Sequence, residues 1–194
     1  MQVGNREDLL AAARRCLDEK GYAHTTARDI AAAAGTSLAA IGYHYRSTEA
    51  LLNAALFKAI EEIGDELARA LTAEDQPPLG SLERFEAYWT QVVESFANHR
   101  QVWAATLEVF GQADRVPEVR RAIADGLEDG RRFWPLLLLG DSALGDEAEA
   151  RAVGSLYQAL LSGVLVQWLI DPERAPSGRD LAQGLRIIAE RLRR

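Results

Sequence analysis

Residue types that could carry out catalysis are few and widely spaced in this sequence. The three histidines are His24, His44 and His99, and the single cysteine is Cys16. Nucleophilic catalysis and metal binding need such side chains in close groups, and the chain has no nucleophile motif, metal-ligand spacing or phosphate-binding loop. We therefore expect no catalytic residue, no metal site and no cofactor, and we look for function in binding.

The most informative segment is the short turn AAGTS at positions 33–37. A helix that begins at Thr25 or Thr26 is predicted before it, and a second short helix, from Leu38 to about Tyr45, after it. In a helix-turn-helix, such a turn orients the second helix for the DNA major groove, and glycine adopts the backbone conformation that the turn needs. An ordinary helical corner has the same turn chemistry, so the turn alone leaves both interpretations open.

Helical periodicity extends along the rest of the chain, where apolar residues recur every three or four positions and runs of β-branched residues are missing. Pro135 is expected to kink or break its helix ahead of the leucine run 136–139. The fold class is expected to be all-α. Further helices are predicted over 5–20, 48–76, 81–99, 100–111, 117–133, 147–170 and from 178 to the C-terminus.

Two sequence segments around the turn at 33–37 resemble the N-terminal DNA-binding domain of the TetR family of transcriptional regulators. They are TTARDIAAAAGTS at 25–37 and IGYHYRSTEALL at 41–52. The resemblance covers roughly residues 5–60, and beyond it only the length and the all-helical plan agree. It implies an N-terminal three-helix helix-turn-helix domain, residues 1–50. A long helix would join this domain to a helical ligand-binding and dimerisation domain, residues 51–194.

The resemblance also implies which residues contact DNA. The threonines that open the second helix correspond to phosphate contacts, and Arg28 is long enough to reach a phosphate or a guanine edge. Leu38 and Ala39 could pack on thymine methyl groups, whereas Ile30, Ile41 and Tyr45 are expected in the core. The candidate DNA-binding residues are Thr25, Thr26, Arg28, Thr36, Ser37, Leu38, Ala39, Tyr43, His44, Ser47 and Thr48.

Two positions depart from the family pattern. Gly42 stands where the family commonly has an aromatic residue, and Thr48 stands where a lysine usually meets phosphate. Both should weaken contact with the DNA backbone. His44 has two interpretations: it makes DNA binding sensitive to pH, since imidazole titrates near neutrality, or it is a hydrogen-bonded core residue.

Most aromatic residues follow position 85, and many share a helical face. Such residues either pack a core or line a cavity for an apolar or aromatic ligand. A ligand cavity is also what the resemblance implies. The candidate ligand-binding residues are Phe85, Trp89, Phe96, Trp103, Phe110, Phe133, Trp134, Tyr157 and Trp168.

Segment 152–170 contains no charged side chain and is just long enough to span a membrane. We expect instead a helix that packs on its own core and on a second subunit, because polar residues interrupt the segment and the other helices are amphipathic. A homodimer would place two recognition helices one DNA turn or more apart. The candidate interface residues are Leu156, Leu160, Val164, Leu181, Leu185 and Ile188.

Charge and cysteine content constrain the class of protein further. The net charge is −7, yet the first fifty residues hold six basic and six acidic side chains, so the excess acid lies in the remainder. One cysteine excludes an intramolecular disulfide, and no apolar signal segment opens the chain. A cytoplasmic location is expected.

Together these features predict a homodimeric TetR-like regulator, a repressor released from a palindromic operator when a small apolar or aromatic effector binds. The expected partners are double-stranded DNA, the effector and a second copy of the chain, with no membrane. The apolar face of the long helix, from Leu52 to Leu71, is expected to transmit effector binding to the DNA-binding domain. Substitution of a bulky residue for Ala59 would test this coupling. An enzyme, and a helical ligand carrier or adaptor that no longer reads DNA, are the alternatives.

Overall fold

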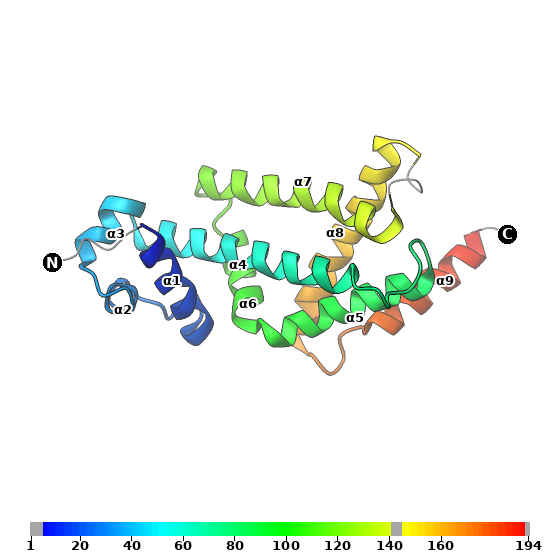
Figure 1. The fold of residues 1–194 in the computed structure, drawn as a ribbon, viewed down its shortest axis with the longest axis horizontal. Coiled ribbons are helices and arrows are strands. Elements are labelled where there is room, and N and C mark those ends of the chain that lie inside the picture. The colour runs from blue at the N-terminus through cyan, green and yellow to red at the C-terminus, as the bar shows by residue number, and fades with distance from the viewer. Residues whose placement is uncertain (1–5, 141–144, 193–194) are drawn as a thin grey trace. The chain divides into compact units, whose positions relative to one another are not determined.

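The computed structural model describes residues 6–140 and 145–192 of the chain, and these residues fold into helices without a strand, as expected (Figure 1). The helices are α1 (Arg6–Lys20), α2 (Ala27–Ala33), α3 (Leu38–Tyr45), α4 (Thr48–Leu71), α5 (Leu82–Asn98), α6 (Arg100–Phe110), α7 (Pro117–Leu139), α8 (Glu147–Ile170) and α9 (Gly178–Leu192).

The helices form two compact units. The first contains the described residues up to Gly64 together with His99–Arg120, and the second contains Asp65–Asn98 and the described residues from Arg121 onward. Helices α4 and α7 each contribute to both units, because their chains run through the boundaries at Gly64 and Arg120. The functional boundary expected after residue 50 therefore lies inside the first packing unit.

The first unit is built on a small apolar core. Helix α1 packs on α2 and α6, and α2 packs on α3. Leu9, Ile30, Ile41 and Tyr45 are buried in this core, which confirms the role expected of the last three. The Tyr45 hydroxyl donates a hydrogen bond of 2.9 Å to the Arg6 carbonyl, and this fixes the end of α3 to the start of α1.

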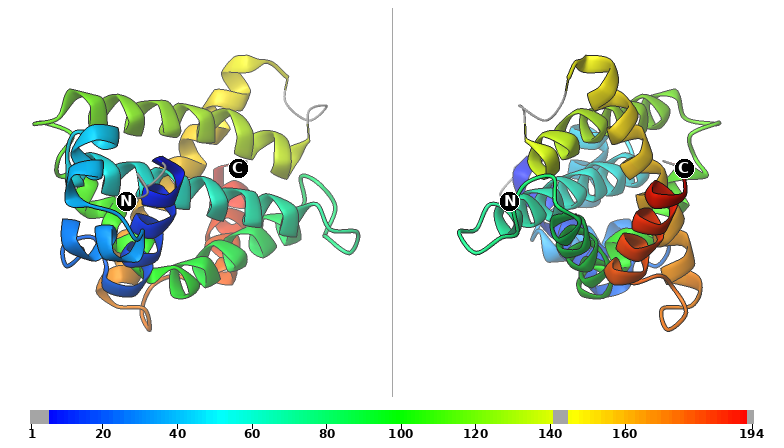
Figure 2. Two further views of the ribbon diagram at one scale, coloured as in Figure 1. Left: turned by 60° about the vertical axis from the view of Figure 1, so that its left-hand side comes forward. Right: turned by 90° about the vertical axis from the view of Figure 1, so that its right-hand side faces the viewer.

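The second unit is organised around α5, which packs against α9 and α8 (Figure 2). One face of α5 presents apolar and aromatic side chains to these neighbours, and Trp89, Val92 and Phe96 are fully buried on it. This periodicity of three and four residues is the one from which the helix was predicted.

Helix α7 continues past Pro135 to Leu139, so of the two outcomes expected at this proline, a kink or a break, the break does not occur. Proline has no N–H to donate to the carbonyl four residues earlier, here that of Arg131. Helix α8 passes close to that carbonyl, because a Cβ built on Gly154 would lie 1.9 Å from the Arg131 oxygen. The Arg131 carbonyl, which lacks its usual helical hydrogen bond because of Pro135, thus faces α8. This helix can approach so closely only because residue 154 is a glycine.

Candidate nucleic-acid interface

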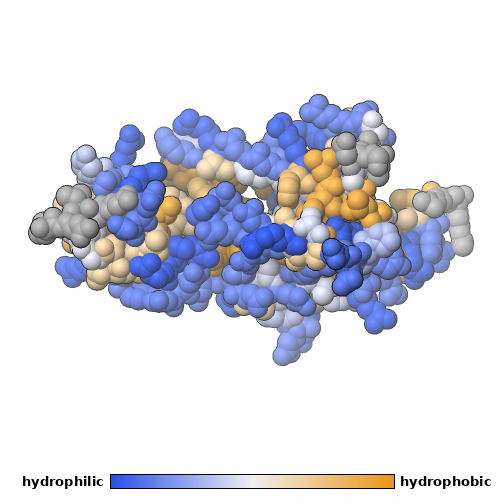
Figure 3. Space-filling view, in the orientation of Figure 1, coloured by the Kyte–Doolittle hydropathy of each residue, from blue (hydrophilic) through white to orange (hydrophobic). Residues whose placement is uncertain are grey.

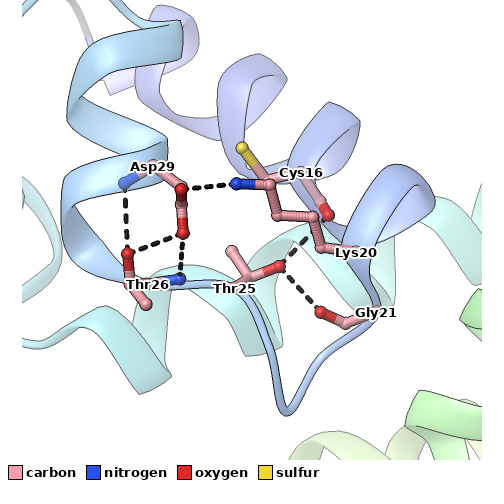
Figure 4. A network of polar contacts seen from close by, with 6 residues as sticks. All are labelled: Cys16, Lys20, Gly21, Thr25, Thr26 and Asp29. Carbon is pink, nitrogen blue, oxygen red and sulfur yellow. Dashed lines mark hydrogen bonds and ion pairs between the residues drawn. The ribbon is translucent and has the colours of Figure 1, made fainter.

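A capping box fixes the N-terminus of α2 (Figure 4). The Thr26 hydroxyl accepts a hydrogen bond from the Asp29 N–H at 3.3 Å, and the Asp29 carboxylate accepts from the Thr26 N–H at 2.9 Å. Lys20, the last residue of α1, pairs with the same carboxylate at 2.5 Å. The hydrogen bonds from Lys20 and then from Thr26 hold the pKa of Asp29 well below its ordinary value.

This network gives a prediction for the pH dependence of stability. A carboxyl whose pKa is lowered by folding stabilises the protein above its unfolded pKa, about 3.9, and loses that contribution as the pH falls toward the folded value. Asp29→Asn should therefore reduce the free energy of unfolding at pH 7, and its difference from the wild type should shrink below about pH 4. Urea unfolding at pH 7, 5 and 3 measures this, and a difference that is constant with pH would contradict it.

Thr25 lies next to the capping box but has a structural role. Its side chain is buried, and its hydroxyl lies 2.7 Å from the Gly21 carbonyl and 3.1 Å from the Cys16 carbonyl, to which it donates (Figure 4). A hydroxyl used in this way joins the end of α1 to the start of α2. We therefore leave Thr25 out of the proposed DNA contacts and keep Thr26 and Arg28, which are exposed.

The turn before α3 has the geometry that was expected of a helix-turn-helix. Gly35 has a φ of +62°, in the left-handed region that glycine adopts without strain. Ser37 follows as the N-cap of α3, and its hydroxyl makes no capping hydrogen bond. The helix then exposes Leu38, at 50% of its surface, and Tyr43, at 83%, with Ala39 and Gly42 also exposed.

His44 is half-buried beside this face, and its ring meets the Tyr43 ring edge-on at 4.9 Å between centroids. Its Nε2 atom is buried and has no hydrogen-bond partner in the described residues. Thr36 is also half-buried. Of the candidate DNA-binding residues in this segment, His44 and Thr36 are therefore less accessible than the exposed residues of α3.

The start of α4 supplies a second set of candidate contacts. The Ser47 hydroxyl accepts a hydrogen bond of 3.0 Å from the Ala50 N–H, which caps the helix, and Thr48 is half-exposed next to it. Arg46, which sequence analysis did not select, lies between α3 and α4 as an exposed cation with a φ of +68°. A positive φ at an arginine leaves no pattern in a sequence, so the residue could not be singled out in advance.

Most of the aromatic candidates for ligand binding lie in the second unit. Tyr157 of α8 is the centre of a cluster there: its ring lies 5.6 Å from Phe85, 5.6 Å from Tyr88 and 6.2 Å from Trp89. Trp134 of α7 joins through Tyr88, at 5.5 Å. We call these five residues, Phe85, Tyr88, Trp89, Trp134 and Tyr157, the aromatic cluster.

The other candidates lie apart from the centre of that cluster or in the other unit. Phe96 and Trp168 contact each other in the second unit, with ring centroids 5.8 Å apart. Phe133 contacts Trp134 but is 47% exposed, and an apolar surface is visible over the C-terminal end of α7 (Figure 3). Trp103 and Phe110 belong to α6, in the first unit.

The phenols of the aromatic cluster are neutral donors. Burial holds the pKa of Tyr88 above its ordinary value, and the negative charge that Tyr157 carries once it is ionised raises it further. Burial raises the pKa of Tyr157 to about 12. Both hydroxyl groups therefore keep their protons at neutral pH.

The candidate interface residues divide by exposure. Leu156, Leu185 and Ile188 are exposed, Leu160 and Leu181 are half-buried, and Val164 is buried within the protomer. The exposed face of α8 instead contains Leu156, Ala159, Gly163, Val166 and Ile170. By length and composition alone α8 would also suit a membrane span, the one such helix among the described residues.

A polar cycle in the first unit escaped sequence analysis. The Tyr22 hydroxyl donates to Asn53 Oδ1 at 2.7 Å and accepts from Gln112 Nε2 at 3.1 Å, and Asn53 Nδ2 donates to Gln112 Oε1 at 3.4 Å. The cycle ties the segment between α1 and α2 to α4 and to the residues after α6. Because these residues are far apart in the chain and form no sequence motif, their contact could be found only in the three-dimensional structure.

Comparison with known proteins identifies the family. Residues 9–55 match the bacterial regulatory proteins of the tetR family, and residues 80–192 match the tetracyclin repressor-like C-terminal domain. The chain is 27% identical over 172 residues to the HTH-type transcriptional regulator TtgR of Pseudomonas putida, a match that covers 87% of this chain and 81% of TtgR.

Two solved structures show the same fold. A TetR transcription regulator from Haloarcula marismortui ATCC 43049 has a TM-score of 0.64 at 20% identity, covering 95% of this chain and 94% of that one. The multidrug binding protein EbrR complexed with imidazole has a TM-score of 0.65 at 25% identity, covering 93% and 88%. With its helix-turn-helix and both matched domains, the chain belongs to the TetR family, whose members are transcriptional regulators and not enzymes.

Proposed function

We propose that the protein is a homodimeric repressor that leaves a palindromic operator when a small aromatic molecule binds to its second unit. The observation that carries the proposal is the exposed apolar face of α3, Leu38, Ala39, Gly42 and Tyr43, directly after the Gly35 turn. Large exposed side chains on a short helix are unfavourable in a solitary domain and are typical of a surface that meets a partner.

This face suits the major groove. The Leu38 side chain and the Ala39 methyl group can contact thymine methyl groups, and the Tyr43 and Ser37 hydroxyls can bond base edges or phosphates. Gly42 is exposed on the same face and adds no side chain to the contact. Arg28 and Arg46 add exposed cations on either side of α3 in the sequence.

The test is binding of the purified protein to DNA that flanks its own gene, at physiological salt with excess nonspecific competitor. A protected, roughly palindromic site supports the proposal. If no selective site is found there, random DNA sequences are screened, and failure in that screen too favours the carrier or adaptor that Gly42 and Thr48 leave open.

Tyr43→Ala should weaken operator binding by about 10- to 100-fold, since a base or groove contact contributes roughly 1–3 kcal/mol. The fold should be unchanged, because the side chain is almost fully exposed. A gel-shift titration with the operator and a melting curve measure the two effects. Phe133→Ala, which removes another exposed ring, is the control and should leave DNA affinity unchanged; equal losses in both variants would contradict the role of Tyr43.

Dimerisation is proposed on the exposed apolar faces of α8 and α9. Leu185, Ile188 and Leu192 are exposed on α9, and five apolar or small residues form the exposed stripe of α8. Two such helices from each protomer can form a four-helix interface about a two-fold axis, which buries these side chains. This accounts for the apolar character of α8 without a membrane, and a regulator of this kind acts in the cytoplasm.

The effector is proposed to bind at the aromatic cluster. Aromatic walls with a few polar groups are typical of sites for small organic molecules. A similar protein binds such compounds, because crystal structures show EbrR in complex with imidazole and with proflavin. An aromatic effector would therefore find stacking partners on α5, α7 and α8.

Coupling between effector and DNA is proposed to pass through α4 and the polar cycle. Bound effector would favour an arrangement of α4 in which the recognition helices no longer match the groove spacing. Ala59 has no exposed surface, so a bulky substitution there would overpack the core and test folding rather than coupling. Substitutions in the Tyr22–Asn53–Gln112 cycle remove single polar groups without overpacking the core, so they are better suited to testing whether these residues are coupled.

Tyr22→Phe removes one hydroxyl from the cycle and leaves the ring in place. It should lower the free energy of unfolding by about 1–2 kcal/mol, because Asn53 and Gln112 each lose a partner. Gln112→Ala and the double variant complete a thermodynamic cycle in urea unfolding, where coupling of at least about 0.5 kcal/mol is expected. Additive losses would show that Tyr22 and Gln112 do not act together.

A further inference from the structure

The aromatic cluster contains a buried hydrogen-bond donor that has no acceptor. Trp89 is fully buried, and its indole N–H has no partner in the described residues. A buried donor normally has an acceptor, so the Trp89 indole can donate to a bound ligand. The hydroxyls of Tyr88 and Tyr157 keep their protons at neutral pH and can also donate to a ligand.

A buried cation lies one helical turn from these rings. Arg84 is only 5% exposed, and a guanidinium group cannot lose its proton in a protein. The guanidinium makes a single hydrogen bond within the described residues, from Nη2 to the Leu137 carbonyl at 3.3 Å. Its Nε is buried without a partner, and no carboxylate in the described chain pairs with it.

The position of Arg84 follows from two helices. Arg84 and Tyr88 are four residues apart on α5, so they share a face. Leu137 and Trp134 are three residues apart on α7, and Trp134 contacts Tyr88 as Leu137 accepts from Arg84. The guanidinium is thus held beside the aromatic cluster by the same pair of helices that supplies Tyr88 and Trp134.

We propose that the effector is an aromatic anion, whose ring packs in the aromatic cluster and whose carboxylate or similar group binds the Arg84 guanidinium. The proposal rests on the proposed function and names the chemical class of its effector. An anion supplies acceptors to donors that lack them and compensates a buried positive charge, whereas an aromatic cation would add a second unpaired charge.

Capping of α7 is the other role open to Arg84. Leu137 is among the last residues of α7, where carbonyls lack helical partners, and a cation there is favourable. That role uses one of the five N–H donors of the guanidinium. It leaves the buried Arg84 Nε and the Trp89 indole N–H without acceptors, and a bound anion would supply an acceptor to both.

Three probes with one ring system separate the charge classes: 1-naphthoate, 1-naphthamide and 1-naphthylmethylammonium. Isothermal titration calorimetry with the full-length protein should show 1-naphthoate binding at least 10-fold more tightly than the neutral amide, and the cation more weakly than both. Arg84→Met keeps the length of the side chain without the charge, and should lower naphthoate affinity at least 10-fold while amide affinity stays within about 3-fold.

Arg132→Met, an exposed arginine of α7, is the matched control and should leave all three affinities unchanged. If Arg84→Met does not fold, the wild-type preference and Arg84→Lys decide, since lysine keeps the charge and should keep the preference for the anion. Equal binding of the amide and naphthoate, a preference for the cation, or no naphthoate binding at millimolar concentration would overturn the proposal. Operator binding without effector is measured separately, so a failure here leaves the proposed regulator intact.

Discussion

Gly163→Arg should convert the protein into a monomer that has lost selective operator binding. In the protomer this glycine is exposed, and a Cβ added to it meets no atom within 4 Å, so the fold should tolerate the change. In the proposed dimer the same position lies in the middle of the α8 stripe, between Ala159 and Val166. A buried arginine without a partner there costs several kcal/mol and faces its own copy across the two-fold axis.

The expected loss of DNA affinity is large because the dimer binds two half-sites at once. Linking two binding modules raises overall affinity by about 10²- to 10⁴-fold, and a monomer forfeits that gain. Sedimentation velocity gives the oligomeric state, and a gel-shift titration with the operator gives the affinity.

Gly126→Arg is the matched control, because this α7 glycine is also exposed with open space around its Cα. It introduces the same side chain outside the proposed interface, and should leave both the dimer and DNA binding as they are. A Gly163→Arg variant that still dimerises with unchanged affinity would exclude the α8 face as the interface.

The fold was predictable because its signals are local. Apolar residues at intervals of three and four, the Thr26 cap and the glycines after helices specify where each helix lies. Pro135, which does not break its helix, shows the limit of local rules. Proline removes one hydrogen bond in any helix, but whether the helix breaks there depends on what packs on it, here Gly154 of a later helix.

The candidate sites were predictable to the extent that exposure follows from helical spacing. Leu38 and Tyr43 are exposed on α3 as expected, whereas Thr25 is buried because its hydroxyl closes the α1–α2 corner. On α8, Val164 is buried, and the exposed face passes through Ala159 and Gly163 instead. In a helical segment without charged residues, such as 152–170, periodicity cannot tell the face that meets the core from the opposite one.

Residues that act through a partner far along the chain could not be predicted at all. Arg84 is one of 22 basic residues, and its sequence neighbours do not distinguish it from an exposed arginine. Its burial depends on the α5–α7 pairing, which brings Leu137 to it across 53 positions. The charge preference proposed for the effector site is therefore a property of the fold.

Gly154→Ala should destabilise the protein more than any other single methyl group added to a glycine of α7 or α8. The new Cβ would lie 1.9 Å from the Arg131 oxygen and 2.6 Å from its carbonyl carbon, far inside contact distance. Both atoms belong to the backbone, so no side chain can move aside, and α7 and α8 must separate. Overpacking of this kind costs roughly 3 kcal/mol, measured as the free energy of unfolding in urea.

Gly126→Ala provides the contrast, since it adds the same methyl group to α7 in open space. Replacing a glycine inside a helix reduces the entropy of the unfolded chain, so this variant should be more stable than the wild type by about 0.5–1 kcal/mol. Opposite signs for the two variants would show that α7 and α8 are in close contact at Arg131 and Gly154. If both variants gain stability, the close approach of these helices is not maintained in solution, and the positions of Trp134 and Tyr157, three residues further along each helix, would have to be revised with it.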